Sequence, residues 1–223
     1  TFTYQVTQGL RMNKEAILES MISAGIFNEE KDEVVDRIYV SEEFKQITTE
    51  KKEELDSSNL ESAAKTLLSR ISNPDAFLES GTKAVDLIAY HQALEDVLDS
   101  GESEYVSPGV LLVIDHLLNG YPRSAGSPDA FLPLRDDQIE SALSLYDQAI
   151  VYVWRDDCHN CDIMVDEFDQ IFEEWTDDVA LLSIFGPRAK EILREKYDVV
   201  GAPTTLFVKN GSIDSRLLGA QHR

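Results

Sequence analysis

The chain is poor in cysteine and has no long apolar run. Cys158 and Cys161 are its only cysteines in 223 residues, which excludes a scaffold held together by several disulfides. No stretch approaches the roughly 20 apolar residues of a membrane-spanning helix, and the first residues lack the charged and apolar pattern of a secretory signal. A single cysteine pair fits a reducing compartment, so these features together predict a cytoplasmic protein.

Basic residues are scarce as well. The chain has 42 acidic and 20 basic residues, a formal net charge of −22 and a pI near 4.4. Nucleic acids and anionic membrane surfaces are bound through clustered Lys and Arg, so we expect neither as a partner. The excess of acid resembles that of proteins from salt-accumulating halophiles, although an acidic mesophilic protein is the alternative. A halophilic protein would become more stable as salt screens its charges.

Signatures of bound cofactors and metals are missing. No GxGxxG fingerprint occurs, so we expect neither a flavin nor a nicotinamide. A zinc site would need two ligands besides the cysteines, and the histidines (His91, His116, His159 and His222) lack the paired spacing of a structural site. We therefore expect no metal, and we expect His91 and His116 to be packing residues within helices.

The two cysteines lie in the tetrapeptide Cys158-His159-Asn160-Cys161. Residues 149–154 before it, AIVYVW, are apolar and rich in β-branched side chains, which predicts a strand. Residues 162–175 after it, DIMVDEFDQIFEEW, carry apolar side chains near helical spacing. The motif therefore lies between a strand and a helix, where unpaired N–H groups and the helix dipole favour a thiolate on Cys158.

Four interpretations of this pair stay open at this point. A thiolate at a helix start could attack a disulfide, after which the second cysteine would resolve the mixed intermediate. The pair could instead be half of a zinc site, a structural disulfide or two inert core thiols. Zinc lacks further ligands, and a bridge closing so short a loop would constrain the unfolded chain little, so disulfide exchange is favoured.

From about Asp129 onward the sequence resembles the thioredoxin family. The segments expected in chain order are an edge strand at 131–135, a helix at 136–148, the strand at 149–154, the CHNC turn, a parallel strand at 179–185, a helix at 188–199 and a hairpin at 206–220. Residues 200–204, VGAPT, are similar to the family's cis-proline loop, and Asn210-Gly211 fits the hairpin turn. The resemblance implies an α/β thioredoxin-like fold, a mixed sheet flanked by helices, over residues 129–223.

The resemblance also implies roles for individual residues. Cys158 would be the nucleophile and Cys161 the resolving thiol. Pro203, if cis, and Ala202 would line the substrate groove, while Trp154 would contact substrate or belong to the core below it. The implied function is thiol-disulfide exchange with protein disulfides, using the redox-active Cys158–Cys161 disulfide and no other cofactor. Electrons would come from a separate reductase or a small thiol.

The sequence departs from the family beside both cysteines. Tyr152 replaces a buried carboxylate that takes the proton of the resolving thiol, and a phenol is a poor base near neutrality. His159 is the candidate catalytic base in its place, because imidazole titrates near neutral pH; it could equally be a solvated turn residue. The acidic pair Asp156-Asp157 disfavours a thiolate on Cys158, whereas Arg155 favours it. The direction of the net shift in the pKa of Cys158 therefore stays open.

Two further departures concern the reduction potential of the Cys158–Cys161 pair and the last helix of the fold. Histidine after the first cysteine predicts a moderately oxidising, isomerase-like couple, with a potential above the about −270 mV of thioredoxin. The family's closing helix has no counterpart among the three residues after Ala220. Either the sequence stops short of that helix or something else covers that face of the sheet, and a face left uncovered could associate with a second copy.

Residues 1–125 predict a mostly helical domain of unknown role. The segments that fit helices are 13–25 with Asn13 as its cap, 29–38, 41–47, 58–71, 74–79, 83–98 and 108–118, preceded by a strand or arm at 1–9. Residues 119–129 are rich in Gly, Pro and Ser and predict a linker. The helical domain could dimerise the protein. In the rival interpretation, the chain is a non-catalytic binding or redox-sensing module whose helical domain binds partners.

Overall fold

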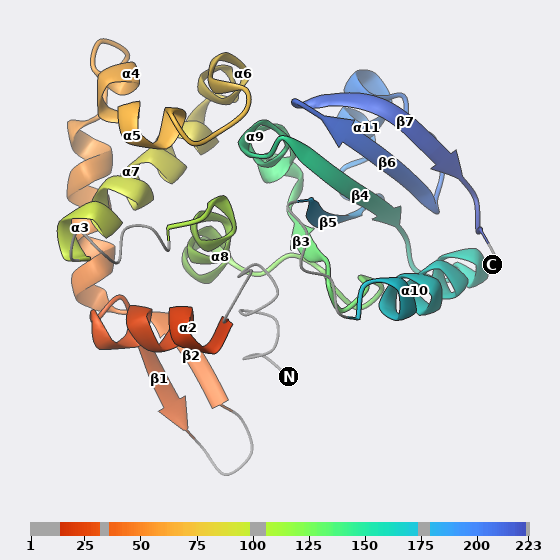
Figure 1. Ribbon diagram of the computed structural model, residues 1–223, viewed down its shortest axis with the longest axis horizontal. Coiled ribbons are helices and arrows are strands. Elements are labelled where there is room, and N and C mark those ends of the chain that lie inside the picture. Colours follow the sequence, from red (N-terminus) through yellow and green to blue (C-terminus); the bar gives the residue numbers. More distant parts are fainter. Residues whose placement is uncertain (1–13, 32–35, 99–105, 174–178, 222–223) are drawn as a thin grey trace. The chain divides into compact units, whose positions relative to one another are not determined.

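The chain divides into two compact units, Thr1–Tyr121 and Pro122–Arg223. The computed structural model describes residues 14–31, 36–98, 106–173 and 179–221 (Figure 1). The boundary falls inside the predicted linker 119–129, and the later part of that segment packs onto the second unit. Ser127 Oγ lies 2.6 Å from Ser183 Oγ, and the Asp129 N–H donates to Asp169 Oδ1 at 2.7 Å.

The first unit contains most of the predicted helices. They are α2 (Lys14–Ser23), α3 (Glu42–Glu54), α4 (Leu60–Ala63), α5 (Lys65–Leu68), α6 (Pro74–Glu79), α7 (Thr82–Val97) and α8 (Pro108–Asn119). Two helix starts have a local cause in the sequence: Ser41 Oγ accepts from the Phe44 N–H before α3, and Pro108 occupies the first turn of α8. The predicted strand at 1–9 and the Asn13 cap lie outside the described residues.

Two helix predictions in this unit were wrong. In the predicted helix 29–38, the described residues belong to strands: β1 (Phe27–Lys31) and β2 (Asp36–Val40) pair antiparallel, and we call the pair the β1–β2 hairpin. Buried Ile38 and Val40 alternate with exposed Tyr39, a period of two that belongs to a strand. Residues 58–71 form α4 and α5 instead of one helix. The Asp56 carboxylate accepts from the Ser58 and Asn59 N–H groups and holds a turn just before α4, so the first of these helices begins at Leu60.

A buried polar cluster joins α7 to α8. The fully buried Asp115 accepts from Lys83 Nζ at 3.0 Å, from the Tyr90 hydroxyl at 3.3 Å and from the Asn119 amide at 2.8 Å. Lys83 also contacts Asp86 at 3.3 Å. Burial, followed by the charge of Asp115, raises the pKa of Tyr90, so this hydroxyl stays a donor.

Both histidines of the first unit are buried, as expected of packing residues. His91 contacts Glu95 at 3.4 Å, and burial lowers the pKa of its imidazole. His116 packs against Tyr121. Among the described residues no helix is long and apolar enough to cross a membrane, and no cluster of metal-ligating side chains occurs.

The second unit is a mixed five-stranded sheet flanked by helices (Figure 1). Its strands are β3 (Leu132–Leu134), β4 (Gln148–Trp154), β5 (Ala180–Phe185), β6 (Thr204–Lys209) and β7 (Ser212–Leu218), in the spatial order β3-β5-β4-β6-β7. The strands β3, β5 and β4 are parallel, whereas β6 is antiparallel to β4 and β7 to β6. Its helices are α9 (Ile139–Leu145), α10 (His159–Ile171) and α11 (Lys190–Tyr197).

Each element of this unit lies where the sequence predicts it. The central strand β4 is buried from Val151 to Trp154, which explains its continuous apolar run. Between β6 and β7, Asn210 (φ 49°) and Gly211 (φ 73°) adopt the left-handed conformations that a type I′ turn requires. The first helix is shorter than predicted, because residues 136–138 form a 3-10 turn before α9.

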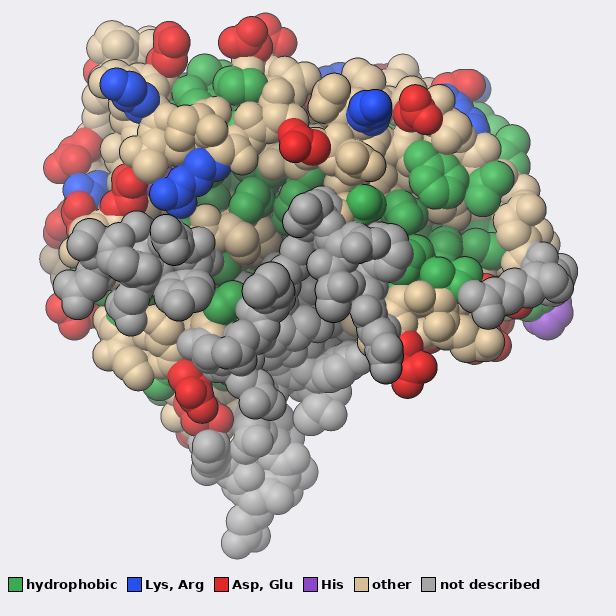
Figure 2. Space-filling view, in the orientation of Figure 1, with side chains coloured by type: hydrophobic (Ala, Val, Ile, Leu, Met, Phe, Trp, Pro, Cys, Tyr) green, Lys and Arg blue, Asp and Glu red, His purple; other side chains and the backbone are tan. Residues whose placement is uncertain are grey.

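Acidic side chains are spread over the surface. In the face shown in Figure 2, Asp and Glu side chains occur at many separate places and do not gather into one patch. Dispersed like charges repel one another, and this is the basis for the expected gain in stability with salt.

Candidate functional site

The two cysteines are joined and lie at the start of α10. Cys158 and Cys161 form a disulfide with a Cα–Cα distance of 5.1 Å. Cys158 is the N-cap of α10, and its Sγ accepts a hydrogen bond from the Cys161 N–H at 3.2 Å. The Cys158 residue is 8% exposed and Cys161 is 3% exposed. Cys158 therefore has the orientation and the N–H contact that stabilise a thiolate once the bond is reduced.

A cis-proline loop lies directly against the disulfide. The Ala202–Pro203 peptide bond is cis. The Ala202 carbonyl oxygen lies 3.9 Å from Cys158 Sγ, and the loop is held by a 2.8 Å bond from Thr204 Oγ1 to the Gly201 carbonyl. The structure thus brings the pair Cys158 and Cys161 next to Ala202 and Pro203, which follow more than 40 residues later in the chain.

Trp154 lies in the core behind this site. Its side chain is 1% exposed and packs on Phe185, with ring centroids 4.9 Å apart. Gly126 lies so close that a Cβ there would be 2.5 Å from Trp154 Cε3. With the Cys158–Cys161 disulfide formed, Trp154 is a packing residue. Direct contact of Trp154 with substrate stays a prediction. The close approach also explains why a glycine of the expected linker belongs to this unit.

Tyr152 supports the first turn of α10. Its hydroxyl donates to the Cys161 carbonyl at 2.9 Å, and its ring packs edge-on against Phe168 at 5.2 Å. Burial, followed by the negative charge of Asp162, raises the pKa of this phenol. Tyr152 is therefore neutral at physiological pH. It positions the backbone of Cys161 and is no base for that thiol.

An aromatic cluster packs beneath the disulfide. Phe131 contacts Phe168 at 5.0 Å and Phe172 at 5.6 Å between ring centroids, and Met164 completes the buried face of α10. The Gln221 N–H contacts Met164 Sδ at 3.1 Å. These contacts fix α10 on the sheet, so the cysteine pair is held on a rigid element.

The charged residues before the motif differ in their surroundings. Asp156 pairs with Arg123 at 2.8 Å, and Arg123 also lies over the Phe185 ring at 4.9 Å. This pair offsets one of the two carboxylates that disfavour a thiolate on Cys158. His159 is exposed at the first position of α10, while His222 lies outside the described residues. Sequence reasoning missed Arg123, because its place in an expected linker gave no sign of a partner.

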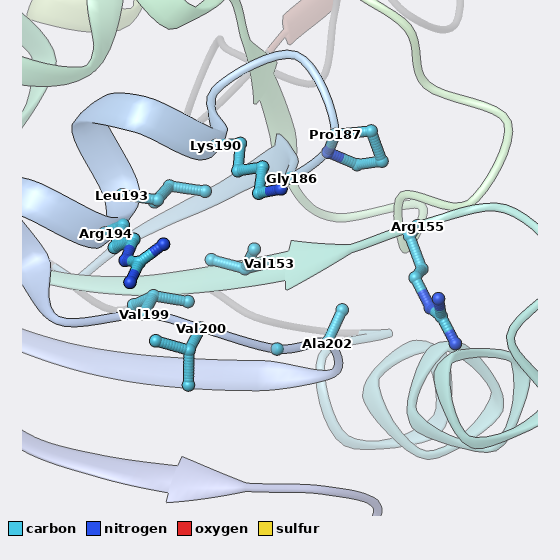
Figure 3. A pocket seen from close by; sticks show the side chains of 11 residues that line it. Val153, Arg155, Gly186, Pro187, Lys190, Leu193, Arg194, Val199, Val200 and Ala202 are labelled. Atoms are coloured by element: carbon cyan, nitrogen blue, oxygen red, sulfur yellow. The ribbon is translucent and has the colours of Figure 1, made fainter.

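A pocket of about 560 Å³ opens beside the cis-proline loop (Figure 3). Its apolar lining includes the buried Val153, Leu193 and Val199, and its rim carries Arg155, Lys190 and Arg194. Ala202 lines it too, so the pocket and the disulfide share a residue. The sequence did not reveal this pocket, since its residues come from three separate segments.

No protein-family model and no curated protein matches the chain. Solved structures do: thioredoxin f2 of Chlamydomonas reinhardtii is 22% identical over 41% of this chain and 85% of its own, with a TM-score of 0.37. Thioredoxin f from spinach chloroplast, in a short form, is 18% identical over 40% of this chain and 80% of its own, with a TM-score of 0.36.

The second unit has a thioredoxin-like fold. Its strand order, the cysteine pair at the start of α10 and the cis-proline loop beside that pair support this assignment independently of the similarity scores. The fold class predicted for residues 129–223 is therefore confirmed. The first unit is mainly helical, and the β1–β2 hairpin is a correction to its predicted class.

Proposed function

We propose that the protein is a thiol-disulfide oxidoreductase that acts on protein disulfides. The observation that carries the proposal is the Cys158–Cys161 disulfide at the amino end of α10, 3.9 Å from the Ala202 carbonyl of the cis-proline loop. Disulfide exchange needs a nucleophilic thiolate, a second thiol within reach and a surface for an extended substrate. The site supplies all of these within one small region.

The exchange proceeds in two balanced steps. In the reduced protein the Cys158 thiolate attacks one sulfur of the substrate disulfide, forms a mixed disulfide and releases the other substrate sulfur as a thiolate. The Cys161 thiolate then attacks Cys158 Sγ, closes the Cys158–Cys161 disulfide and releases the second substrate sulfur. Two electrons have passed to the substrate. A separate reductase or a small thiol restores the dithiol, and no bound cofactor takes part.

Neighbouring residues assist these steps. The Cys161 N–H and the α10 dipole stabilise the Cys158 thiolate. The backbone of Ala202 pairs with an extended substrate segment, and Pro203 shapes the groove. His159 accepts the proton of the resolving thiol, since the neutral Tyr152 cannot.

The first test is the reduction of insulin disulfides with dithiothreitol as the electron source. Wild-type protein is expected to accelerate the reaction, and the Cys158→Ser variant is expected to react at the uncatalysed rate, because serine forms no thiolate at neutral pH. Lys209→Ser, an exposed substitution at the end of β6, is the control for a general effect of the change. Equal rates for wild type and Cys158→Ser would refute the enzyme and favour a binding or redox-sensing module.

A further inference from the structure

The basic rim of the pocket is unusual for so acidic a protein. Arg155, Lys190 and Arg194 surround an apolar lining in a chain of net charge −22. Within residues 14–31, 36–98, 106–173 and 179–221, no carboxylate forms an ion pair with any of the three. Several other cations of this unit are paired, among them Arg123 with Asp156, Lys196 with Glu140 and Arg216 with Asp198. The pocket therefore concentrates positive charge that the fold itself does not use.

The sequence of α11 separates its charges by face. Lys190, Leu193 and Arg194 follow the i, i+3, i+4 spacing of one helix face, and all three line the pocket. The acids Glu191 and Glu195 of the same helix point about 100° or more away from the centre of this face. Neither of them lines the pocket. The apolar and basic side chains are thus turned to the pocket, while the acidic ones are kept out of it.

The pocket is placed to hold part of a substrate during exchange. Ala202 belongs to its wall and lies 3.9 Å from Cys158 Sγ, and Arg155 comes three residues before Cys158. In Figure 3, Arg194 lies beside Val199 and Val200 at one end, and Arg155 lies at the other end beyond Ala202. Val200 is 84% exposed, so it offers an apolar contact on the same loop. A chain segment paired with Ala202 would carry its flanking side chains over this pocket.

We infer that the pocket binds an acidic segment of the protein substrate, with Asp or Glu side chains close to the disulfide that Cys158 attacks. The inference rests on the proposed function and narrows its substrates. Carboxylates match the three cations, and the methylene groups of Glu match the apolar lining. The acidic surface elsewhere repels such a segment, which leaves this pocket as the place where it is held.

The test compares three cystine peptides that differ only in the residues flanking the disulfide, Glu, Gln or Lys. At fixed low salt, we expect kcat/KM for the Glu peptide to exceed that for the Gln peptide by roughly three- to tenfold, as two or three exposed ion pairs would give. The Lys190→Glu/Arg194→Glu variant should lose or invert this preference. Arg188→Glu/Lys209→Glu makes the same charge change at exposed positions outside the pocket and should retain the preference.

A binding experiment separates this inference from the proposed function. The Cys158→Ser/Cys161→Ser protein cannot exchange disulfides, and fluorescence anisotropy should still show tighter binding of the Glu peptide than of the Gln peptide. Equal turnover and equal binding of the three peptides would overturn the inference and leave the oxidoreductase intact. Binding of free succinate together with equal binding of the Glu and Gln peptides would overturn it too, because the pocket would then not recognise a peptide segment. Tighter binding of the Glu peptide without any turnover by the wild type would support the preference of the pocket for acidic segments and refute the proposed oxidoreductase activity.

Discussion

The Cys161→Ser variant is expected to stop halfway through the reaction and accumulate as a mixed disulfide with its substrate. The Cys158 thiolate can still attack, because its contact with the residue-161 N–H is a backbone contact that serine preserves. Resolution needs the second sulfur, which the wild type holds one helical turn away at the buried face of α10. The lifetime of the complex should lengthen from about seconds to about hours, the range open to unassisted thiol-disulfide reshuffling. Non-reducing gel electrophoresis and mass spectrometry measure it.

Two control variants show which cysteine forms the trapped mixed disulfide. The Cys158→Ser variant keeps Cys161 and should trap nothing, since Cys161 is 3% exposed and its backbone is held by Tyr152. The Cys158→Ser/Cys161→Ser protein should also trap nothing. Trapping through Cys161 in the Cys158→Ser variant would reverse the two roles, and an untrapped but active Cys161→Ser variant would show that resolution uses a thiol from elsewhere.

Loss of the Asp115 carboxylate should destabilise the first unit strongly. Asp115 is 0% exposed and accepts from Lys83, Tyr90 and Asn119. In Asp115→Ala, the buried Lys83 ammonium would lose its 3.0 Å ion pair with Asp115, and the Tyr90 hydroxyl would lose the carboxylate to which it donates. Breaking a buried pair by removing one partner costs about 3–5 kcal/mol, so the free energy of unfolding from urea titration followed by far-UV circular dichroism should fall by that amount.

The matched control is Asp96→Ala in α7. Asp96 pairs with Lys51 at 2.6 Å, but its side chain is 54% exposed, and such surface pairs contribute about 0–1 kcal/mol. The two variants therefore remove the same group and differ in burial. An Asp115→Ala protein as stable as Asp96→Ala would show that the cluster contributes nothing net, as happens when desolvation offsets the attraction.

The second unit was predictable from sequence because its signals are local. A continuous apolar run marks a strand covered on both faces, as in β4, and the Asn210-Gly211 pair marks a turn with two left-handed residues. The Cys158–Cys161 spacing between a strand and a helix predicted the position of the cysteine pair at the start of α10. Each of these patterns spans fewer than about 15 residues, so no tertiary information was needed to read it.

The features that sequence reasoning missed depend on contacts across the chain. The β1–β2 hairpin was taken for a helix, because a short stretch with three or four apolar residues fits both periods. The Arg123–Asp156 pair joins residues 33 apart, and the pocket takes its wall from β4, α11 and the cis-proline loop. The spacing of Lys190, Leu193 and Arg194 was visible in the sequence, but nothing there showed what that face covers.

The central claim is that Cys158 is a reactive thiolate at the amino end of α10, and alkylation of the reduced protein tests it most directly. Brief treatment with iodoacetamide at pH 7, followed by mass-spectrometric quantification at each cysteine, compares the two thiols in one molecule. We predict that Cys158 is modified at least about tenfold faster than Cys161, because it has the greater exposure and the N–H contact that stabilises the thiolate. Equal rates at the two sulfurs, or faster modification of Cys161, would contradict the account.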